Sequence, residues 1–317
     1  MADKLLNTPG VKRVSVTELT DRLVASYAKV GGINHVDGVN LPSKTKIAHI
    51  SRQLLRLLFP GFFDHKQIHS SELKIETAML MDEVKNELED EICKSIVYRA
   101  PGGDEKTNPR ELADCVTGEF LGRLPEIREI LQTDVDAAYN GDPAAISREE
   151  IIVAYPFVET IAIQRLAHEL YTRNISLIPR IMTEWVHDRT GIDLHPGARI
   201  GTHFFIDHGT GTVVGETTQI GNHVKIYHGV TLGAKSTSRV EELRGSKRHP
   251  TLEDRVTVYP GATILGGDTV IGHDSTIGGN VFIMDSVNPK SLVIYDGLDM
   301  RVLDKEKKPP KDQDFQI

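Results

Sequence analysis

The sequence predicts an α+β fold, with an all-helical N-terminal domain over residues 1–191 and a parallel β-helix of hexapeptide repeats over residues 192–288. One observation behind this is an aliphatic side chain at every sixth position across most of residues 192–284, a period that neither helices nor ordinary strands share. The other is that the preceding residues carry apolar side chains at helical spacing, between helix caps and helix breakers. We therefore expect helices first and repeated short strands afterwards.

Each six-residue repeat is expected to form one short strand and one turn, so that three repeats complete a triangular coil. The aliphatic residue of each repeat points inward and stacks on its counterparts in neighbouring coils. A glycine often follows it, which suits a turn where a side chain would collide or where φ is positive. A twisted antiparallel sheet with regular turns is the alternative, although the period holds on both sides of a long insertion. The inward positions are Leu194, Ile200, Ile206, Val214, Ile220, Ile226, Leu232, Leu252, Val258, Ile264, Ile271, Ile277 and Ile283.

The residues before the β-helix predict a series of helices separated by recognisable breaks. Asn108-Pro109 starts one of them well, because Asn caps free N–H groups and Pro fits the first turn. Ser147 with Glu150 forms a second capping pair for a later helix. The expected helices cover about residues 17–27, 46–59, 71–98, 109–123, 125–139, 147–173 with an interruption at Pro156, and 176–189.

Composition limits the classes of protein to which the chain can belong. Its 317 residues are enough for two domains, and its formal net charge of -8 without a long basic run argues against a nucleic-acid partner. No apolar stretch approaches membrane-spanning length, and no signal-peptide pattern is present. Cys93 and Cys115 lack metal-ligand spacing, so we expect no metal site and a reducing, cytoplasmic location.

Two segments leave the repeat pattern. Residues 233–251 are polar and charged, and an excursion of this size from a regular solenoid predicts a functional loop, with a tolerated surface insertion as the alternative. Residues 289–317 end in a stretch rich in Lys and Pro that closes at Ile317, which predicts a flexible C-terminal tail.

The β-helix is rich in histidine, and one of these residues is a candidate general base. Asp207-His208 lies at a turn where the repeat stretches to eight residues, and Asp193 precedes it by somewhat less than one coil. A histidine whose tautomer is held by a carboxylate is the simplest general base at neutral pH, and it can activate a hydroxyl or an amine. No glycine-rich phosphate loop leads from a strand into a helix, so a nucleotide-fold enzyme is not indicated.

Five short runs in this region form a more specific pattern. They are Asp193-Leu194-His195-Pro196-Gly197-Ala198, Ile206-Asp207-His208-Gly209-Thr210-Gly211, Val213-Val214-Gly215-Glu216-Thr217, Gly229-Val230-Thr231-Leu232-Gly233 and Lys247-Arg248-His249-Pro250. Together they closely resemble the serine O-acetyltransferases, a family of hexapeptide-repeat acyltransferases. The resemblance covers about residues 109–284. It implies that the β-helix is left-handed and that residues 1–105 are an atypical extension of the helical domain.

The resemblance also implies an activity and the residues that perform it. The expected reaction transfers acetyl from acetyl-CoA to the hydroxyl of L-serine, giving O-acetyl-L-serine for cysteine biosynthesis. His208 resembles the family's general base, and Asp193 resembles the carboxylate paired with it. His249 resembles a residue of the amino acid site and is the third catalytic candidate, because it could serve as the base in place of His208.

Three further residues resemble those that bind the amino acid substrate. Asp142, in the helical domain, and Asp207 resemble carboxylates of the family's substrate site, whereas Arg248 resembles its guanidinium group. The chemistry is sensible, because a zwitterionic amino acid needs carboxylates for its ammonium group and an arginine for its carboxylate. This set argues for an amino acid rather than a sugar as the acceptor.

Acetyl-CoA is expected as a co-substrate, with no tightly bound cofactor and no metal, because the thioester itself supplies the leaving group. The resemblance assigns its groove to Ala234, Pro260 and Gly279. The chain departs from the family pattern around this groove. A longer loop begins at Ala234, Val258-Tyr259-Pro260-Gly261 replaces the usual Ile-Gly-Ala-Gly, and residues 294–298 replace the usual Gly-x-Pro-Ala segment.

The resemblance further implies partners. We expect a homotrimer or a dimer of trimers, because the family builds its site between neighbouring β-helices. L-Cysteine is a candidate feedback inhibitor. Cysteine synthase is a candidate partner through Ile317, because members of the family often end in an isoleucine that docks into that enzyme.

Three other functions stay open at this point. The chain could be a hexapeptide acyltransferase for another hydroxyl acceptor, such as a sugar. It could be a zinc lyase of the carbonic anhydrase type, which would need three histidines converging on one metal. It could also be a catalytically silent scaffold that binds a partner through its tail.

Overall fold

The computed structural model describes residues 14–64, 66–100, 108–235 and 245–295. The chain divides into two compact units, Met1–Asn40 and Leu41–Ile317. The first unit contains helix α2 (Val16–Lys29) and the short 3-10 helix η1 (Gly31–Ile33). Helix α2 begins where predicted, because the hydroxyl of Ser15 accepts a hydrogen bond from Glu18 N at 3.1 Å. Most of the predicted tail, residues 296–317, lies outside the described residues.

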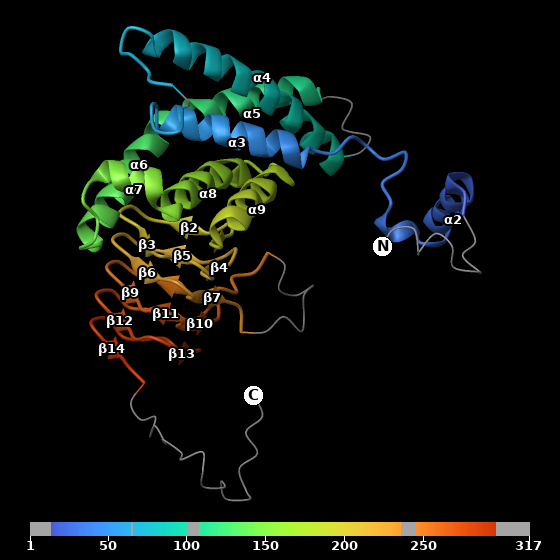
Figure 1. The fold of residues 1–317 in the computed structure, drawn as a ribbon. Helices are drawn as coiled ribbons and strands as arrows, with labels where there is room; N and C mark the ends of the chain where they lie inside the picture. Colours follow the sequence, from blue (N-terminus) through green and yellow to red (C-terminus); the bar gives the residue numbers. More distant parts are fainter. Residues whose placement is uncertain (1–13, 65, 101–107, 236–244, 296–317) are drawn as a thin grey trace, which may run out of the picture. The chain divides into compact units, whose positions relative to one another are not determined.

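The second unit starts with the helices that the sequence predicts (Figure 1). The caps at Asn108 and Ser147 are present, and Pro156 separates two helices. None of the described helices has the length and apolar composition needed to cross a lipid bilayer. The helices are α3 (Lys44–Leu58), α4 (Leu73–Arg99), α5 (Pro109–Gly122), α6 (Leu124–Gly141), α7 (Arg148–Ala154), α8 (Pro156–Thr172) and α9 (Ile178–Thr190).

Strands follow directly after α9 and form the predicted parallel β-helix (Figure 1). Every paired strand in the described residues runs parallel to its neighbour, in three sheets with the orders β1-β4-β7-β10-β13, β11-β8-β5-β2 and β14-β12-β9-β6-β3. The strands are β1 (Asp193–Leu194), β2 (Arg199–Ile200), β3 (Phe205–Asp207), β4 (Val213–Val214), β5 (Gln219–Ile220), β6 (Lys225–Tyr227), β7 (Thr231–Gly233), β8 (Thr251–Leu252), β9 (Thr257–Val258), β10 (Thr263–Leu265), β11 (Val270–Ile271), β12 (Thr276–Ile277), β13 (Phe282–Ile283) and β14 (Leu292–Val293).

The aliphatic residue of each hexapeptide points into the β-helix. All thirteen predicted inward residues belong to the core, and only Ile200 is partly rather than fully buried. Strand register stacks them directly, as in the column Leu194, Val214, Leu232, Ile264 and Ile283. The core is therefore a ladder of aliphatic side chains along the axis, as the period predicts.

The glycines after these residues serve one of the two predicted purposes. Gly201, Gly221 and Gly272 do not have positive φ; instead a β-carbon at each would overlap with the next coil. Positive φ occurs elsewhere in the turns, in part at non-glycine residues such as His203 and His208. Close approach between coils, rather than left-handed backbone, is thus what these glycines permit.

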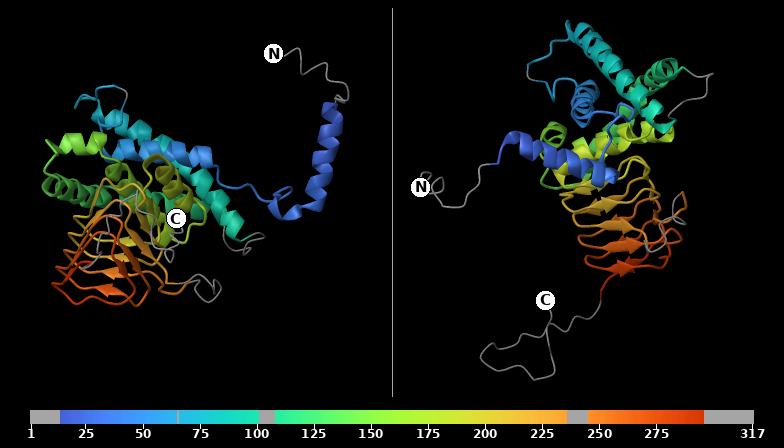
Figure 2. Two further views of the ribbon diagram at one scale, coloured as in Figure 1. Left: turned by 60° about the horizontal axis from the view of Figure 1, so that its bottom comes forward. Right: turned by 90° about the vertical axis from the view of Figure 1, so that its right-hand side faces the viewer.

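The three sheets meet at three corners of the triangular coil, whose outline is visible along the axis (Figure 2, left). The first corner joins the β3 sheet to the β1 sheet and includes residues 208–212, 228–230, 260–262 and 279–281. The second corner joins the β1 sheet to the β2 sheet and includes residues 195–198, 215–218, 234–250 and 266–269, of which 236–244 lie outside the described residues. The third corner, which includes residues 201–204, 221–224, 253–256 and 272–275, completes each coil.

A buried ion pair fastens the helices to the first coil. The guanidinium of Arg165 on α8 makes two hydrogen bonds, of 2.8 and 3.0 Å, to the carboxylate of Asp134 on α6. It also donates to the backbone carbonyls of Ile200 and Gly201, and Asp134 accepts from Phe204 N. These bonds position the end of α6 beside the first coil.

Candidate active site

The first corner carries the predicted base and one of the predicted substrate carboxylates. Asp207 ends β3 and is buried, whereas His208 follows with a left-handed φ of 60° and a side chain that is 75% exposed. His208 Nε2 lies 3.8 Å from Asp207 Oδ1. The ammonium of Lys225, on the adjacent strand β6, lies 3.1 Å from Asp207 Oδ2. An exposed imidazole therefore stands beside a buried, paired carboxylate.

Asp142, the second predicted substrate carboxylate, joins this group from the helical region. It caps the end of α6, where Oδ1 accepts from Ala144 N at 2.8 Å and Oδ2 accepts from the hydroxyl of Tyr155 at 2.6 Å. These two hydrogen bonds hold the pKa of Asp142 below its ordinary value. The hydrogen bond between Tyr155 and Asp142 raises the pKa of Tyr155 to about 12. Lys225 Nζ donates to Gly141 O at 2.7 Å, which ties this turn to the coil that carries Asp207.

Asp193 lies near the first corner but does not bond to His208 within the described chain. It begins β1, and its Oδ1 lies 3.5 Å from the guanidinium of Arg180 on α9. That oxygen is buried and accepts no hydrogen bond from the described residues. Within the described chain, the charged group that faces the Asp193 carboxylate is thus Arg180, and the Asp193–His208 pair stays a prediction.

The second corner carries His249, the third catalytic candidate, in a tightly built setting. Its Nδ1 accepts from Thr217 N at 3.1 Å and lies 2.9 Å from Thr217 Oγ1. The ring rests against Gly215, where a β-carbon would overlap with it. Burial, and then the positive charge of Arg248, lower the pKa of His249 to about 4. His249 is thus neutral at physiological pH.

Arg248, the predicted partner of the substrate carboxylate, is ion-paired to Glu216 at the same corner. Tyr171 on α8 donates to the other carboxylate oxygen of Glu216 at 2.5 Å. Burial alone would raise the pKa of Glu216, but the hydrogen bonds from Tyr171 and Arg248 bring it below its ordinary value. Arg248 N also donates to Thr217 Oγ1 at 2.9 Å. The second corner therefore presents an arginine and a neutral histidine on a hydrogen-bonded support.

The predicted acetyl-CoA residues divide between the same two corners. Pro260 and Gly279 are neighbours on successive coils at the first corner, where Asn280 N donates to Pro260 O at 2.9 Å. Ala234 follows β7 at the second corner. In the described chain, the predicted site residues thus form two groups: the first-corner group of Asp142, Asp207 and His208, and the second-corner group of Arg248 and His249.

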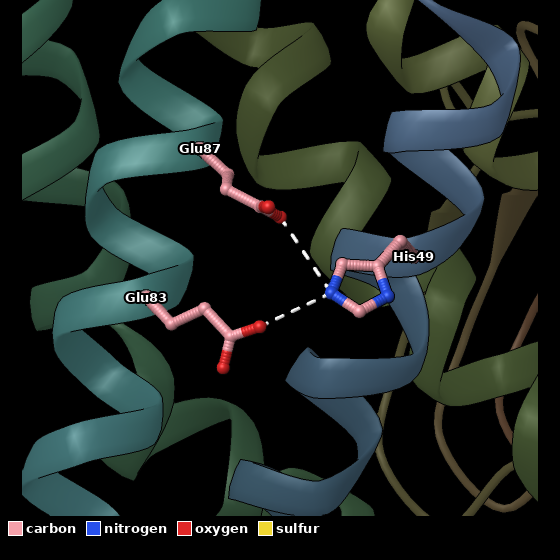
Figure 3. A group of neighbouring side chains, drawn as sticks. All are labelled: His49, Glu83 and Glu87. Atoms are coloured by element: carbon pink, nitrogen blue, oxygen red, sulfur yellow. Dashed lines mark hydrogen bonds and ion pairs between the residues drawn. The ribbon is translucent and has the colours of Figure 1, made fainter.

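Two clusters of possible metal ligands occur among the described residues, each with a single histidine. His49, Glu83 and Glu87 lie between α3 and α4, with His49 Nε2 at 3.2 Å from Glu83 Oε1 and 3.8 Å from Glu87 Oε2 (Figure 3). The other cluster contains Glu184, His187 and Asp193. The described part of one chain therefore contains no three-histidine centre of the kind that a zinc lyase would need.

Sequence reasoning missed several residues that support the predicted ones. Lys225 and Tyr155 contact the two aspartates of the first corner, and Tyr171 contacts Glu216 at the second. Glu216 was visible within the Val-Val-Gly-Glu-Thr run, but nothing there signals its pairing with Arg248. The other contacts join residues 13 to 45 positions apart, and no local spacing reveals such pairs.

Comparison with known proteins gives a consistent result. No family model matches the chain. The plasmid serine acetyltransferase of Synechococcus elongatus is 44% identical over 230 residues, which cover 70% of this chain and 72% of that protein. The serine acetyltransferase of Mycobacterium tuberculosis is 46% identical over 132 residues, and that match spans 42% of this chain and 55% of the relative.

Solved structures of the same kind share the fold. Serine acetyltransferase isoform 3 of Entamoeba histolytica, solved in complex with cysteine, superposes with a TM-score of 0.70 at 31% identity, covering 91% of this chain and 95% of that one. The enzyme of Brucella abortus strain S19, solved in complex with coenzyme A, gives a TM-score of 0.51 at 26% identity, with coverage of 78% and 93%. Because identity and fold agree over most of both chains, this chain is an acyltransferase that belongs to the serine acetyltransferase family.

Proposed function

We propose that the chain transfers the acetyl group of acetyl-CoA to the hydroxyl of L-serine, giving O-acetyl-L-serine and CoA in the cytoplasm. The observation that carries this proposal is the first-corner group, in which two carboxylates, Asp142 and Asp207, lie around the exposed imidazole of His208. Such a group suits an acceptor that has both an ammonium and a hydroxyl. The relatives named serine acetyltransferase point to the same acceptor.

The complete site would form between two subunits. The first-corner group has no cation for the serine carboxylate apart from the adjacent Lys225, which already contacts Asp207. The second-corner group has Arg248 but contains neither His208 nor the two aspartates. Side-by-side packing of β-helices would bring the first corner of one subunit against the second corner of its neighbour. We therefore expect at least a homotrimer, and a dimer of trimers is also compatible with this packing.

In the proposed reaction, Asp142 and Asp207 hold the serine ammonium while Arg248 of the neighbouring subunit pairs with its carboxylate. His208 Nε2 takes the hydroxyl proton as the serine oxygen bonds to the thioester carbonyl carbon. The tetrahedral intermediate then expels the CoA thiolate, which recovers that proton from the imidazolium. No metal takes part. Most of the rate would come from orienting two substrates and stabilising the oxyanion.

Asp193 is proposed to hold the tautomer of His208. Its buried Oδ1, which accepts no hydrogen bond from the described residues, is available for the second ring nitrogen if the Arg180 side chain yields. His249 is the alternative base. Its low pKa keeps it neutral, but its Nδ1 already contacts the amide and hydroxyl of Thr217.

The direct test is release of free thiol from acetyl-CoA with L-serine, compared with a panel of sugars and other hydroxyl acceptors. Serine-dependent release that exceeds every other acceptor would support the proposal. A better sugar acceptor would favour the general hexapeptide acyltransferase instead. Zinc bound stoichiometrically without thiol release would favour a lyase. If the chain neither releases thiol nor binds zinc, the catalytically silent scaffold would remain as the explanation.

Subunit complementation tests where the site lies. His208→Ala chains are expected to be nearly inactive, and Arg248→Ala chains are expected to have little activity at serine concentrations well below their raised KM. In co-refolded mixed trimers assayed at such low serine, about a quarter of the sites would pair two intact halves. Activity should therefore reappear in the mixture and not in either parent. A mixture as inactive as its parents would place the whole site within one chain.

The remaining expectations concern ligands and partners. Acetyl-CoA is proposed to contact Ala234, Pro260 and Gly279, and L-cysteine is proposed to compete for the serine site, as the cysteine complex of the Entamoeba relative suggests. Binding to cysteine synthase through Ile317 concerns residues outside those described, so it stays a prediction from the sequence. Calorimetric titration of that enzyme with the full chain and with an Ile317 deletion would test it.

A further inference from the structure

We propose that Lys225 is a positioning residue that sets the charge and geometry of the acceptor site by joining Asp207 to the turn that carries Asp142. This inference rests on the proposed function and deepens it, because it explains how two carboxylates are matched to an acceptor with one ammonium group. Lys225 belongs to none of the runs that carry the family resemblance.

The geometry gives Lys225 two partners from different parts of the fold. Its Nζ lies 3.1 Å from Asp207 Oδ2, within the β-helix, and donates at 2.7 Å to the carbonyl of Gly141, the last residue of α6. Asp142 follows Gly141 directly. A β-carbon at Gly141 would stand 3.1 Å from the Phe205 ring, so the turn lies close against the strand that leads to Asp207. One ammonium thus fixes both carboxylate-bearing segments.

The surroundings make this contact stronger than an ordinary surface ion pair. The side chains of Lys225 and Asp207 are only 20% and 13% exposed. Lys225 Nζ lies 5.0 Å from the ring centroid of Phe205 and 4.6 Å from that of Tyr227, which in turn stacks on Tyr259. Burial opposes the charge of Lys225, but the hydrogen bonds with Tyr227 and Asp207 raise its pKa above the ordinary value. Lys225 therefore stays cationic throughout the physiological range.

The charge balance explains what this cation does for the substrate. Asp142 and Asp207 carry two negative charges, and Lys225 neutralises one, which leaves a single negative charge for the ammonium of an amino acid. Without Lys225, Asp207 would lose its nearest cation, and the turn that carries Asp142 would lose its bond to the coil. The two carboxylates would then no longer converge on one ammonium, and their unbalanced negative charge would oppose the serine carboxylate. The titratable groups that face this position are His208, Tyr227, Asp142 and Tyr155.

The test compares Lys225→Met with Lys225→Arg in steady-state kinetics. In Lys225→Met, KM for L-serine should rise about tenfold or more, while KM for acetyl-CoA changes less than about twofold. Lys225→Arg, which keeps the charge, should recover most of the wild-type KM for serine. Lys85→Met, which removes a lysine paired with Asp114 between α4 and α5, is the matched control.

A purely structural role for Lys225 predicts a different result. Loss of the bond to Gly141 alone would lower thermal stability and kcat without raising KM for serine more than KM for acetyl-CoA, and that outcome would overturn the proposal. An unchanged KM for serine in Lys225→Met would overturn it equally. Calorimetric titration of L-serine into the wild type, Lys225→Met and Lys225→Arg distinguishes failure of this inference from failure of the proposed function. Wild-type binding that Lys225→Met loses supports this inference even without acetyl transfer, whereas a wild-type chain that neither binds nor acetylates serine defeats both.

Discussion

Gly215 and His249 are in direct contact at the second corner, and the imidazole of His249 occupies the space that a side chain at position 215 would need. The contact joins the turn after β4 to the end of the loop over residues 233–251. His249 also accepts a hydrogen bond from Thr217 N and lies two residues before strand β8. Its ring therefore cannot move aside without breaking that hydrogen bond. The position of Arg248 beside it depends on the same packing.

Gly215→Ala should therefore disable the enzyme without unfolding it. We expect kcat/KM for serine to fall about tenfold or more, because a small displacement of Arg248 and His249 misplaces the acceptor. Serine kinetics and circular dichroism would measure the two effects. Gly118→Ala is the control, because Gly118 is exposed in α5 with no atom near a new β-carbon, and it should keep full activity and gain about 0.5–1 kcal/mol of stability. Full activity in Gly215→Ala would mean that the ring is free to move.

His208→Ala should remove the general base. Turnover is expected to fall by about 10²- to 10⁴-fold with the thermal unfolding curve little changed, because the side chain is exposed. Thiol release at saturating substrates is the measurement. His273→Ala, at the third corner, should keep its activity. If His208→Ala retains more than about a tenth of wild-type turnover, the base is another residue, and His249 would be tested next.

Arg248→Ala should affect the amino acid far more than the thioester. Its guanidinium is proposed to exchange Glu216 for the serine carboxylate, so KM for serine should rise at least about tenfold while KM for acetyl-CoA stays nearly constant. Inhibition by L-cysteine, which carries the same charged groups, should weaken in parallel. Arg255→Ala removes an arginine that is similarly paired, with Asp274 at 2.6 Å, but at the third corner, and it should leave both constants unchanged. Equal rises in both KM values for Arg248→Ala would indicate a loop-folding role.

The fold could be predicted in detail because its signals are local and repeated. The inward column of aliphatic residues follows from a period of six alone, and the helix starts at Asn108 and Ser147 follow from side chains that bond within three residues. The choice between the two purposes of the glycines could not be made in the same way. Whether Gly201 needs positive φ or close approach depends on the next coil, twenty residues later, where the carbonyl of Gly221 lies.

The candidate site was predictable only in part, for the same reason. Asp207 and His208 are adjacent in sequence, so their proximity needed no structure. Lys225 reaches back to Gly141 across 84 positions, and the sequence offers no sign of that contact. The expected Asp193–His208 pair stays a prediction, and within the described chain Arg180, on a helix packed over the first coil, faces the carboxylate. Contacts that depend on how helices pack on the β-helix are beyond local pattern.

Two histidines at the second corner, His249 buried and His195 partly buried, should make the fold sensitive to mild acid. Burial, and then the charge of Arg180, lower the pKa of His195 to about 4, and His249 has a similar value. Unfolded histidine titrates near 6.5, so between about pH 6.5 and 4 the unfolded chain binds protons that the folded chain does not. The contribution of both residues is therefore complete above about pH 6.5 and is lost progressively as the pH falls toward 4.

The unfolding free energy, measured by urea titration, should consequently fall between pH 7.5 and 5.5 by an amount on the order of 1 kcal/mol per histidine, after allowance for their partial exposure. Asn has an oxygen near the position of Nδ1 and does not titrate. The double variant His195→Asn with His249→Asn can therefore keep the acceptors for Gly197 N and Thr217 N while flattening this dependence. His69→Asn, at an exposed position before α4, should leave the slope as it is in the wild type. A double variant with the wild-type slope would show that neither histidine is held neutral by burial, and that other groups destabilise the fold in acid.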